Sequence, residues 1–165
     1  MDAEIATYWR YIASSLDRMV ECVAELDEAQ LGWRPPAEGA NSLRVLTVHT
    51  FGNAEENVLG QLGREDVPRD RDSEFRAAAG TGAELQERWR ALRPLMERAL
   101  EALEHDALDR LHDHPRRETL SGREVLLVVA RHAAEHLGQA ELTRDLLRAA
   151  GDGRQSSGGA ASGST

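Results

Sequence analysis

The chain has 165 residues and a formal net charge of −9, and its 41% hydrophobic and 30% charged residues are typical of one globular domain rather than a disordered chain. All 20 basic residues are arginine, but 29 acidic residues outnumber them, which argues against binding nucleic acid through its phosphates. The single cysteine, Cys22, excludes an intramolecular disulfide and a CxxC motif. The acidic start is unlike a secretory signal, and no stretch approaches about 18 apolar residues. We therefore expect a cytoplasmic protein with no membrane span.

The first predicted helix follows from apolar residues that alternate at spacings of four and three between residues 5 and 26. This stripe contains Ile5, Trp9, Ile12, Leu16, Met19, Val23 and Leu26. Such spacing is typical of an amphipathic helix, and the pair Pro35-Pro36 cannot continue it. Cys22 lies beside the stripe with no basic neighbour in sequence, so we expect a small buried residue rather than a nucleophile.

A second helix is expected to begin at a cap formed by Asn41 or Ser42 and to continue to Leu62. His49 lies on the inner stripe of this helix, the row of residues that is expected to face the other helices. The following segment, residues 63–80, is rich in Asp and Arg and exceeds the usual helix–helix loop of roughly 2–8 residues. We expect it to be a long connection across the helices.

Two capping boxes, Thr81 with Glu84 and Ser121 with Glu124, predict the starts of the third and fourth helices. The stripe of the third helix, residues 85–103, is expected to lie in the core. Pro94 lies inside it and should kink or split the helix, because proline removes a backbone hydrogen bond.

The linker at residues 104–120 is polar, and no convincing strand is evident there or elsewhere. Its three histidines, His105, His112 and His114, are expected to be exposed. Together the four amphipathic segments predict an all-α fold, a four-helix bundle with a long connection between helices 2 and 3. We expect one domain over residues 1–150 and a flexible Gly/Ser-rich tail over residues 151–165.

Two histidines lie on the inner stripe of the fourth helix, where apolar side chains are expected. His132 and His136 are one turn apart, so both imidazoles point to one side. An HxxxH pair is often only a hydrogen-bonded pair in a core. Because His49 is also on an inner stripe, the three imidazoles can converge on one divalent metal ion, and imidazole suits zinc, nickel, iron or copper. Three protein ligands leave an open position, as in catalytic zinc sites.

Three polar residues could support these histidines. Asn53 follows His49 by one turn, Glu56 follows it by two turns, and Gln139 is three residues after His136. Each could orient a ligand through a hydrogen bond, and Glu56 could also act as a base. The alternative for Glu56 is a solvated charge on the helix surface.

Three segments resemble the DinB/YfiT-like superfamily of metalloenzymes: WRPP…NSL at residues 33–43, LTVH at 46–49 and RHAAEHLGQ at 131–139, whose form is HxxxHxGQ. The resemblance spans about residues 1–149. It implies a metal triad of His49, His132 and His136 for zinc or nickel, with iron or manganese as further options, and often a homodimer. Some relatives are S-transferases or isomerases that use low-molecular-weight thiols.

The resemblance favours a thiol-dependent S-transferase or isomerase that acts on small electrophilic molecules, with a low-molecular-weight thiol as co-substrate. Two alternatives stay open. One is a metal-dependent hydrolase that uses bound water, and the other is a bundle that binds a metal or ligand without catalysis.

Overall fold

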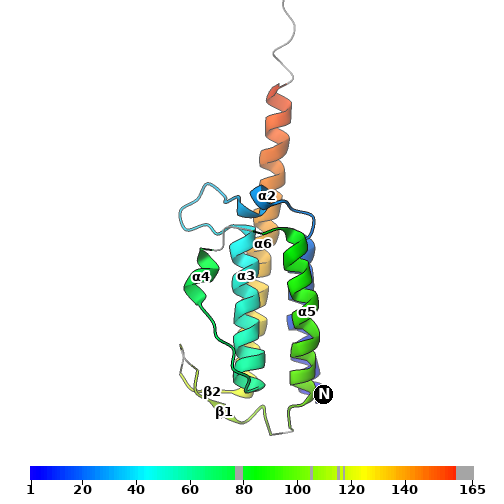
Figure 1. Cartoon of the computed structure of the whole chain (residues 1–165), viewed down its shortest axis with the longest axis vertical. Helices are drawn as coiled ribbons and strands as arrows, with labels where there is room; N and C mark the ends of the chain where they lie inside the picture. Colours follow the sequence, from blue (N-terminus) through cyan, green and yellow to red (C-terminus); the bar gives the residue numbers. More distant parts are fainter. Residues whose placement is uncertain (77–79, 105, 115, 117, 159–165) are drawn as a thin grey trace, which may run out of the picture.

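The computed structural model describes residues 1–76, 80–104, 106–114, 116 and 118–158 (Figure 1). The predicted, predominantly helical fold is confirmed. In chain order the elements are α1 (Ala3–Val23), α2 (Glu28–Gly32), α3 (Leu43–Ala54), the π-helix η1 (Glu55–Leu62), α4 (Arg71–Phe75), α5 (Gly82–Glu101), β1 (Leu111–His112), β2 (Leu120–Ser121) and α6 (Gly122–Gly158).

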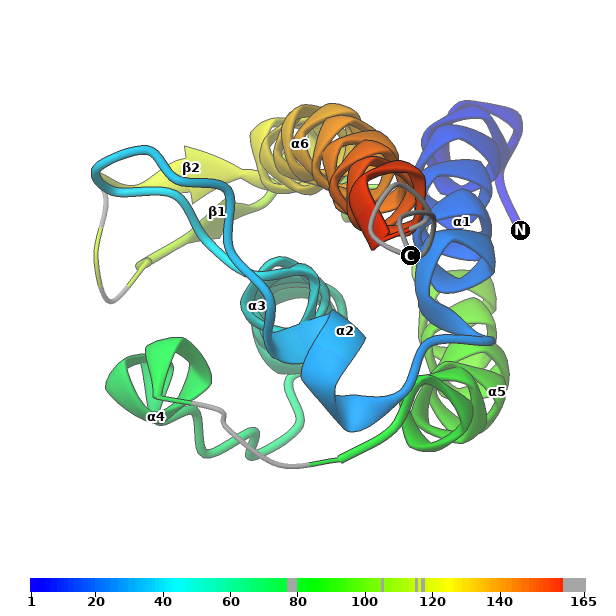
Figure 2. The same ribbon diagram turned by 90° about the horizontal axis from the view of Figure 1, so that it is seen from above.

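The long helices pack side by side around two clusters of buried hydrophobic residues. α6 contacts α1 and α3, α1 contacts α5, and α5 contacts η1, so the contacts form a closed ring (Figure 2). The predicted stripe of α1 is buried within this ring, and Trp9 lies 6.4 Å from Trp89 between ring centroids. Trp89 also stacks on Phe51 of α3 at 5.8 Å and donates its indole N–H to Asp17 of α1 at 2.7 Å. Val129 and Ala133 of α6 belong to the same cluster of buried residues as Phe51, so this packing fixes α3 and α6 relative to each other.

The helix starts follow the predicted capping residues. The Ser42 hydroxyl accepts the backbone N–H of Val45, which begins α3. Thr81 and Glu84 form both bonds of a capping box at α5. At the start of α6, Ser121 and Glu124 exchange the same pair of bonds.

The second predicted helix changes its hydrogen bonding halfway. After Ala54 the chain continues as the π-helix η1, where bonds of the i→i+5 type widen each turn. The bond from the Gly63 N–H to the Val58 carbonyl, at 2.9 Å, is of this type. Apolar periodicity alone cannot distinguish such a turn from an α-helical one.

Several connecting segments differ from the prediction. The connection at 63–80 contains α4, which packs against α3 outside the ring of long helices (Figure 2). The linker at 104–120 ends in a small antiparallel ribbon that pairs Leu111 with Ser121. Both elements are too short to produce a readable hydrophobic period.

Pro94 neither splits nor ends α5, which is assigned as one helix from Gly82 to Glu101. Its neighbours Leu92 and Met96 are buried in the core. Their burial on both sides of the proline offsets the missing backbone bond.

The end of α6 extends beyond residue 150 into the predicted tail, and it rises above the other helices in Figure 1. Residues 159–165 lie outside the described part of the chain. Within that part, no helix combines the length and the apolar character that crossing a membrane requires.

Candidate metal centre

The structure brings together the three histidines of the inner stripes. His49 is in the middle of α3, and His132 and His136 face it from α6. The ring centroids are 4.4–5.3 Å apart, and one nitrogen from each ring lies within 4.8 Å of the others. His49 is buried, and the other two are half-buried. This arrangement is a possible metal site.

Glu74 of α4 fixes the ring of His49. The Nδ1–H of His49 donates to Glu74 Oε2 at 2.8 Å, which leaves Nε2 as the nitrogen with a lone pair. Burial alone would raise the pKa of Glu74, but hydrogen bonds from His49 and Arg69 outweigh burial and hold this pKa below its ordinary value. Glu74 therefore stays ionised and remains an acceptor at neutral pH.

Arg69 holds this carboxylate in place. Its Nε donates to Glu74 Oε1 at 2.6 Å, its Nη2 donates to Oε2 at 2.8 Å, and its Nη1 donates to Glu56 Oε2 at 2.9 Å. The three side chains are 6–9% exposed, so buried charges of opposite sign pair with one another. Such a fork-like arginine fixes both carboxylates with little freedom.

Gln139 orients the ring of His136 as Glu74 orients the ring of His49. The Nδ1–H of His136 donates to Gln139 Oε1 at 2.8 Å, which again presents Nε2. Burial lowers the pKa of His136, and the bond to Gln139 opposes this only in part. The neutral imidazole is the form that binds metals.

The donor set fits a divalent ion. The Nε2 atoms of His49 and His132 are 3.1 Å apart. Two imidazole nitrogens, each about 2.0–2.1 Å from one tetrahedral ion, would be about 3.3 Å apart. These two rings are therefore spaced for one ion, and one nitrogen of His136 lies within 4.8 Å of theirs.

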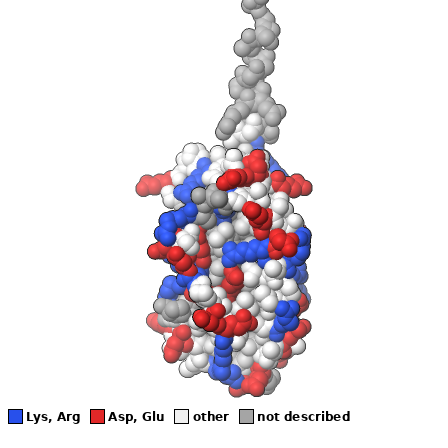
Figure 3. Space-filling view, viewed as in Figure 1, with Lys and Arg blue, Asp and Glu red and all other residues white. Residues whose placement is uncertain are grey.

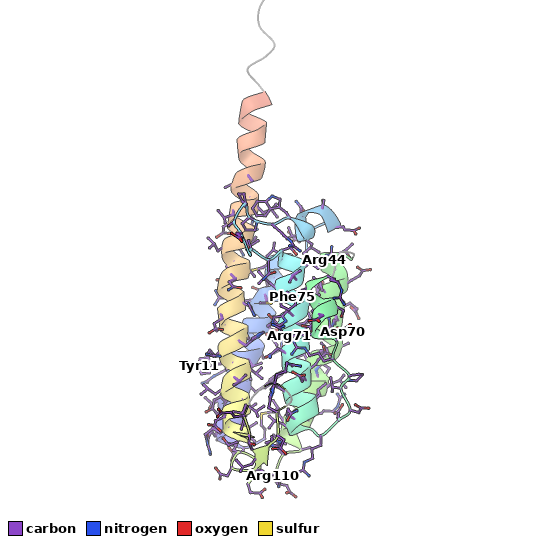
Figure 4. All side chains as sticks on the ribbon, turned by 90° about the vertical axis from the view of Figure 1, so that its left-hand side faces the viewer. Tyr11, Arg44, Asp70, Arg71, Phe75 and Arg110 are labelled. Atoms are coloured by element: carbon purple, nitrogen blue, oxygen red, sulfur yellow. The ribbon has the colours of Figure 1, made fainter. Side chains whose placement is uncertain are left out.

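A cleft of about 510 Å³ opens beside the three histidines. Arg71 and Phe75 of α4 form one wall, and Figure 4 shows both over the middle of α3. The Phe75 ring lies 4.8 Å from the His49 ring, and the Arg71 guanidinium carbon lies 4.9 Å from the Phe75 centroid. Asn53 also lines the cleft, and its Oδ1 is buried with no hydrogen-bond partner among the described residues.

Three expectations for individual residues are wrong. Glu56 is not a solvated charge, because it is buried and accepts from Arg69 and Arg116. His114 is not exposed: it is 8% accessible, lines the cleft and bonds Asn57 Oδ1 through Nε2 at 3.2 Å. His112 is half-buried rather than exposed, and His105 lies outside the described residues.

Sequence reasoning missed the residues that reach the site from connecting segments, namely Arg69, Arg71, Glu74, Phe75, His114 and Arg116. One signal was available in Gly52, a glycine one turn after His49 inside a predicted helix. A Cβ at this position would lie 2.1 Å from Glu74 Oε1. Gly52 therefore allows the carboxylate to approach the backbone of α3.

Comparisons with known proteins agree with this fold. A crystal structure described as a conserved protein from Enterococcus faecalis has a TM-score of 0.71 and 16% identity, over 90% of this chain and 99% of that one. A DinB-like protein from Bacillus cereus has a TM-score of 0.67 and 18% identity, over 89% and 91%. No curated protein matches the sequence. The profile of the DinB superfamily matches residues 11–140, so the chain belongs to this superfamily.

Proposed function

We propose that this protein, built on a four-helix bundle, is a divalent-metal-dependent enzyme that uses a low-molecular-weight thiol. The enzyme either transfers the thiol to a small electrophilic molecule or uses the thiol to isomerise that molecule. The supporting observation is the group of three histidine nitrogens within 4.8 Å beside a cleft of about 510 Å³. Three protein ligands leave an exchangeable position, and a cleft of this size admits a small molecule.

Each residue around the histidines has a defined task. Glu74 and Gln139 accept the Nδ1–H of His49 and His136 and so orient the rings. Arg69 keeps Glu74 ionised, and the Phe75 ring shields one side of His49 from water. A divalent ion, zinc or nickel by preference and iron or manganese as alternatives, would supply Lewis acidity that lowers the pKa of an incoming thiol or water.

Metal content tests the first part of this proposal. The wild type and a His132→Ala/His136→Ala variant are purified without nickel resin and compared by elemental mass spectrometry. We expect about one equivalent of metal in the wild type and little in the variant. A His112→Ala variant, which loses an imidazole outside the triad, should keep its metal. A wild type that holds no metal and refuses added Zn²⁺ and Ni²⁺ would contradict the proposal.

Thiol dependence tests the second part. The metal-loaded protein is incubated with chromogenic electrophiles, with and without added thiols. Turnover that requires the thiol supports a transferase, whereas turnover without it would identify a hydrolase. A metal-filled protein that neither turns over nor binds azide or imidazole would be a non-catalytic metal-binding bundle.

We further propose that the protein works as a homodimer in the cytoplasm. Exposed leucines on α6 support a partner surface, since Leu127 is 55% and Leu142 is 62% accessible. Light scattering should give twice the mass of the chain.

A further inference from the structure

The cleft beside the histidines is basic, although the chain as a whole is acidic. Its lining includes Arg69, Arg71 and Arg116, and among the described residues no aspartate or glutamate lines it. The chain carries a net charge of −9, and charges of both signs are interspersed on the face shown in Figure 3. A concave site lined by one sign of charge concentrates small ions of the opposite sign.

Arg69 does not account for this excess of positive charge. All three of its guanidinium nitrogens bond to Glu56 or Glu74, and its side chain is 6% exposed. Arg69 is therefore committed within the protein. Two glutamates face three arginines, so the cluster keeps one excess positive charge before any metal ion is added.

Arg116 lies at the mouth of the cleft with donors to spare. Its side chain is 39% exposed, and its Nη2 bonds Glu56. A guanidinium has more N–H donors than this one bond uses. Its backbone N–H donates to His114 Nδ1 at 3.1 Å, and His114 in turn donates to Asn57. This chain of bonds holds Arg116 toward the cleft.

Arg71 lies in the same lining, against the face of Phe75. The described residues form no ion pair with Arg71, and its side chain is exposed. Stacking on an aromatic ring leaves the edge of the guanidinium available for hydrogen bonds. Planar guanidinium groups with free edges are suited to carboxylates.

Asn53 gives an independent indication of a ligand. The residue is 7% exposed, and its buried Oδ1 has no partner among the described residues. A buried acceptor without a partner destabilises the protein, so a ligand that donates an N–H or O–H would satisfy it.

We propose that the cleft takes a small molecule bearing a carboxylate, which binds Arg71 and Arg116 while a donor on the same molecule reaches Asn53. This inference rests on the proposed function and deepens it, since it names the chemistry of the substrate or thiol that the same site takes.

The test compares glutaramate, which carries one carboxylate and one amide N–H donor, with glutaramide, a neutral molecule of the same length, by isothermal titration calorimetry of the zinc-loaded full chain. We expect glutaramate to bind at least about tenfold more tightly, because hydrogen bonds to charged groups are stronger than neutral ones. An Arg71→Gln/Arg116→Gln variant should lose this preference and stay folded, since Arg69 still pairs with both buried glutamates. Circular dichroism checks the fold. An Arg76→Gln variant, at an exposed site just after α4, should keep the preference.

Three results would overturn this inference: no binding of glutaramate, equal binding of the two molecules, or a preference that survives in the double variant, in which case the metal alone holds the carboxylate. These results are separate from the thiol test. A protein that prefers glutaramate but needs no thiol for turnover would retain the carboxylate site and lose the transferase assignment. A thiol-dependent enzyme without this preference would keep the transferase assignment and lose the carboxylate site.

Discussion

The ring of His49 is fixed by Glu74, a carboxylate that comes from 25 residues further along the chain. The carboxylate of Glu74 keeps the proton of His49 on Nδ1 and accepts hydrogen bonds from buried Arg69. Replacing Glu74 by glutamine removes this negative charge. We expect zinc affinity to fall about 10- to 100-fold, as is typical when a partner of a ligating histidine is changed. Competition with a chromogenic chelator measures this change.

An Asp72→Asn variant is the matched control, since Asp72 is an exposed acid on the same short helix. It should bind zinc as tightly as the wild type. Equal affinity in folded Glu74→Gln and wild type would show that Glu74 does not support the metal ligand.

Cys22 is a second residue whose environment changes its chemistry. Burial raises the pKa of its thiol, and the nearby Arg144, whose Nη1 lies 3.4 Å from Sγ, opposes this only in part. The folded state therefore holds the thiol proton more tightly than the unfolded state. The protonated thiol therefore favours the folded state. Its contribution to the free energy of unfolding is complete below the ordinary thiol pKa of about 8.5 and is lost as the pH rises through the higher pKa of the folded state.

The free energy of unfolding should accordingly fall more between about pH 7.5 and 9.5 in the wild type than in Cys22→Ala. Urea titrations followed by tryptophan fluorescence measure it. Because the chain has no lysine, few other groups titrate in this range. Parallel pH dependence in the two proteins would contradict the raised pKa.

At the scale of elements, α5 tolerates a proline that ought to weaken it. Pro94 is exposed in the middle of the helix, so alanine can replace it without changing the core. The substitution restores a backbone N–H, and the regained hydrogen bond stabilises the helix by up to about 3 kcal/mol. It also raises the conformational entropy of the unfolded chain, which lowers the free energy of unfolding by about 0.4–1 kcal/mol. We expect a net gain of about 1–2 kcal/mol in the free energy of unfolding.

Urea unfolding of Pro94→Ala and wild type measures this gain. Glu97→Ala, an exposed substitution one turn away, should stay within about 0.5 kcal/mol of the wild type. A Pro94→Ala protein that is less stable than the wild type would mean that α5 is shaped around the proline.

Across the whole molecule, the sequence predicts the long helices well and the supporting residues poorly. The inner stripes of α3 and α6 suffice to bring His49, His132 and His136 together, because packing buries both stripes between the same helices. Glu74 lies in a helix of five residues that has no readable period, and Arg116 lies in a connection between short strands. Their positions depend on long-range contacts, which a single sequence does not specify.

The three histidines also connect two helices that are far apart in sequence, so metal binding should stabilise the fold as a whole. A ligand that binds only the folded state adds about 2.7 kcal/mol when its free concentration is 100 times its Kd. We expect Zn²⁺ to raise the midpoint of thermal unfolding of the metal-free wild type in a concentration-dependent way. Mg²⁺, which prefers oxygen ligands, should leave it unchanged.

The His132→Ala/His136→Ala variant separates this effect from zinc binding elsewhere. It keeps His49 on α3 but removes both imidazoles of α6, so zinc can no longer join the two helices. Its midpoint should not respond to Zn²⁺ at concentrations that shift the wild type. If both proteins shift equally, zinc acts at other sites, and the three histidines are not the metal centre of the folded molecule.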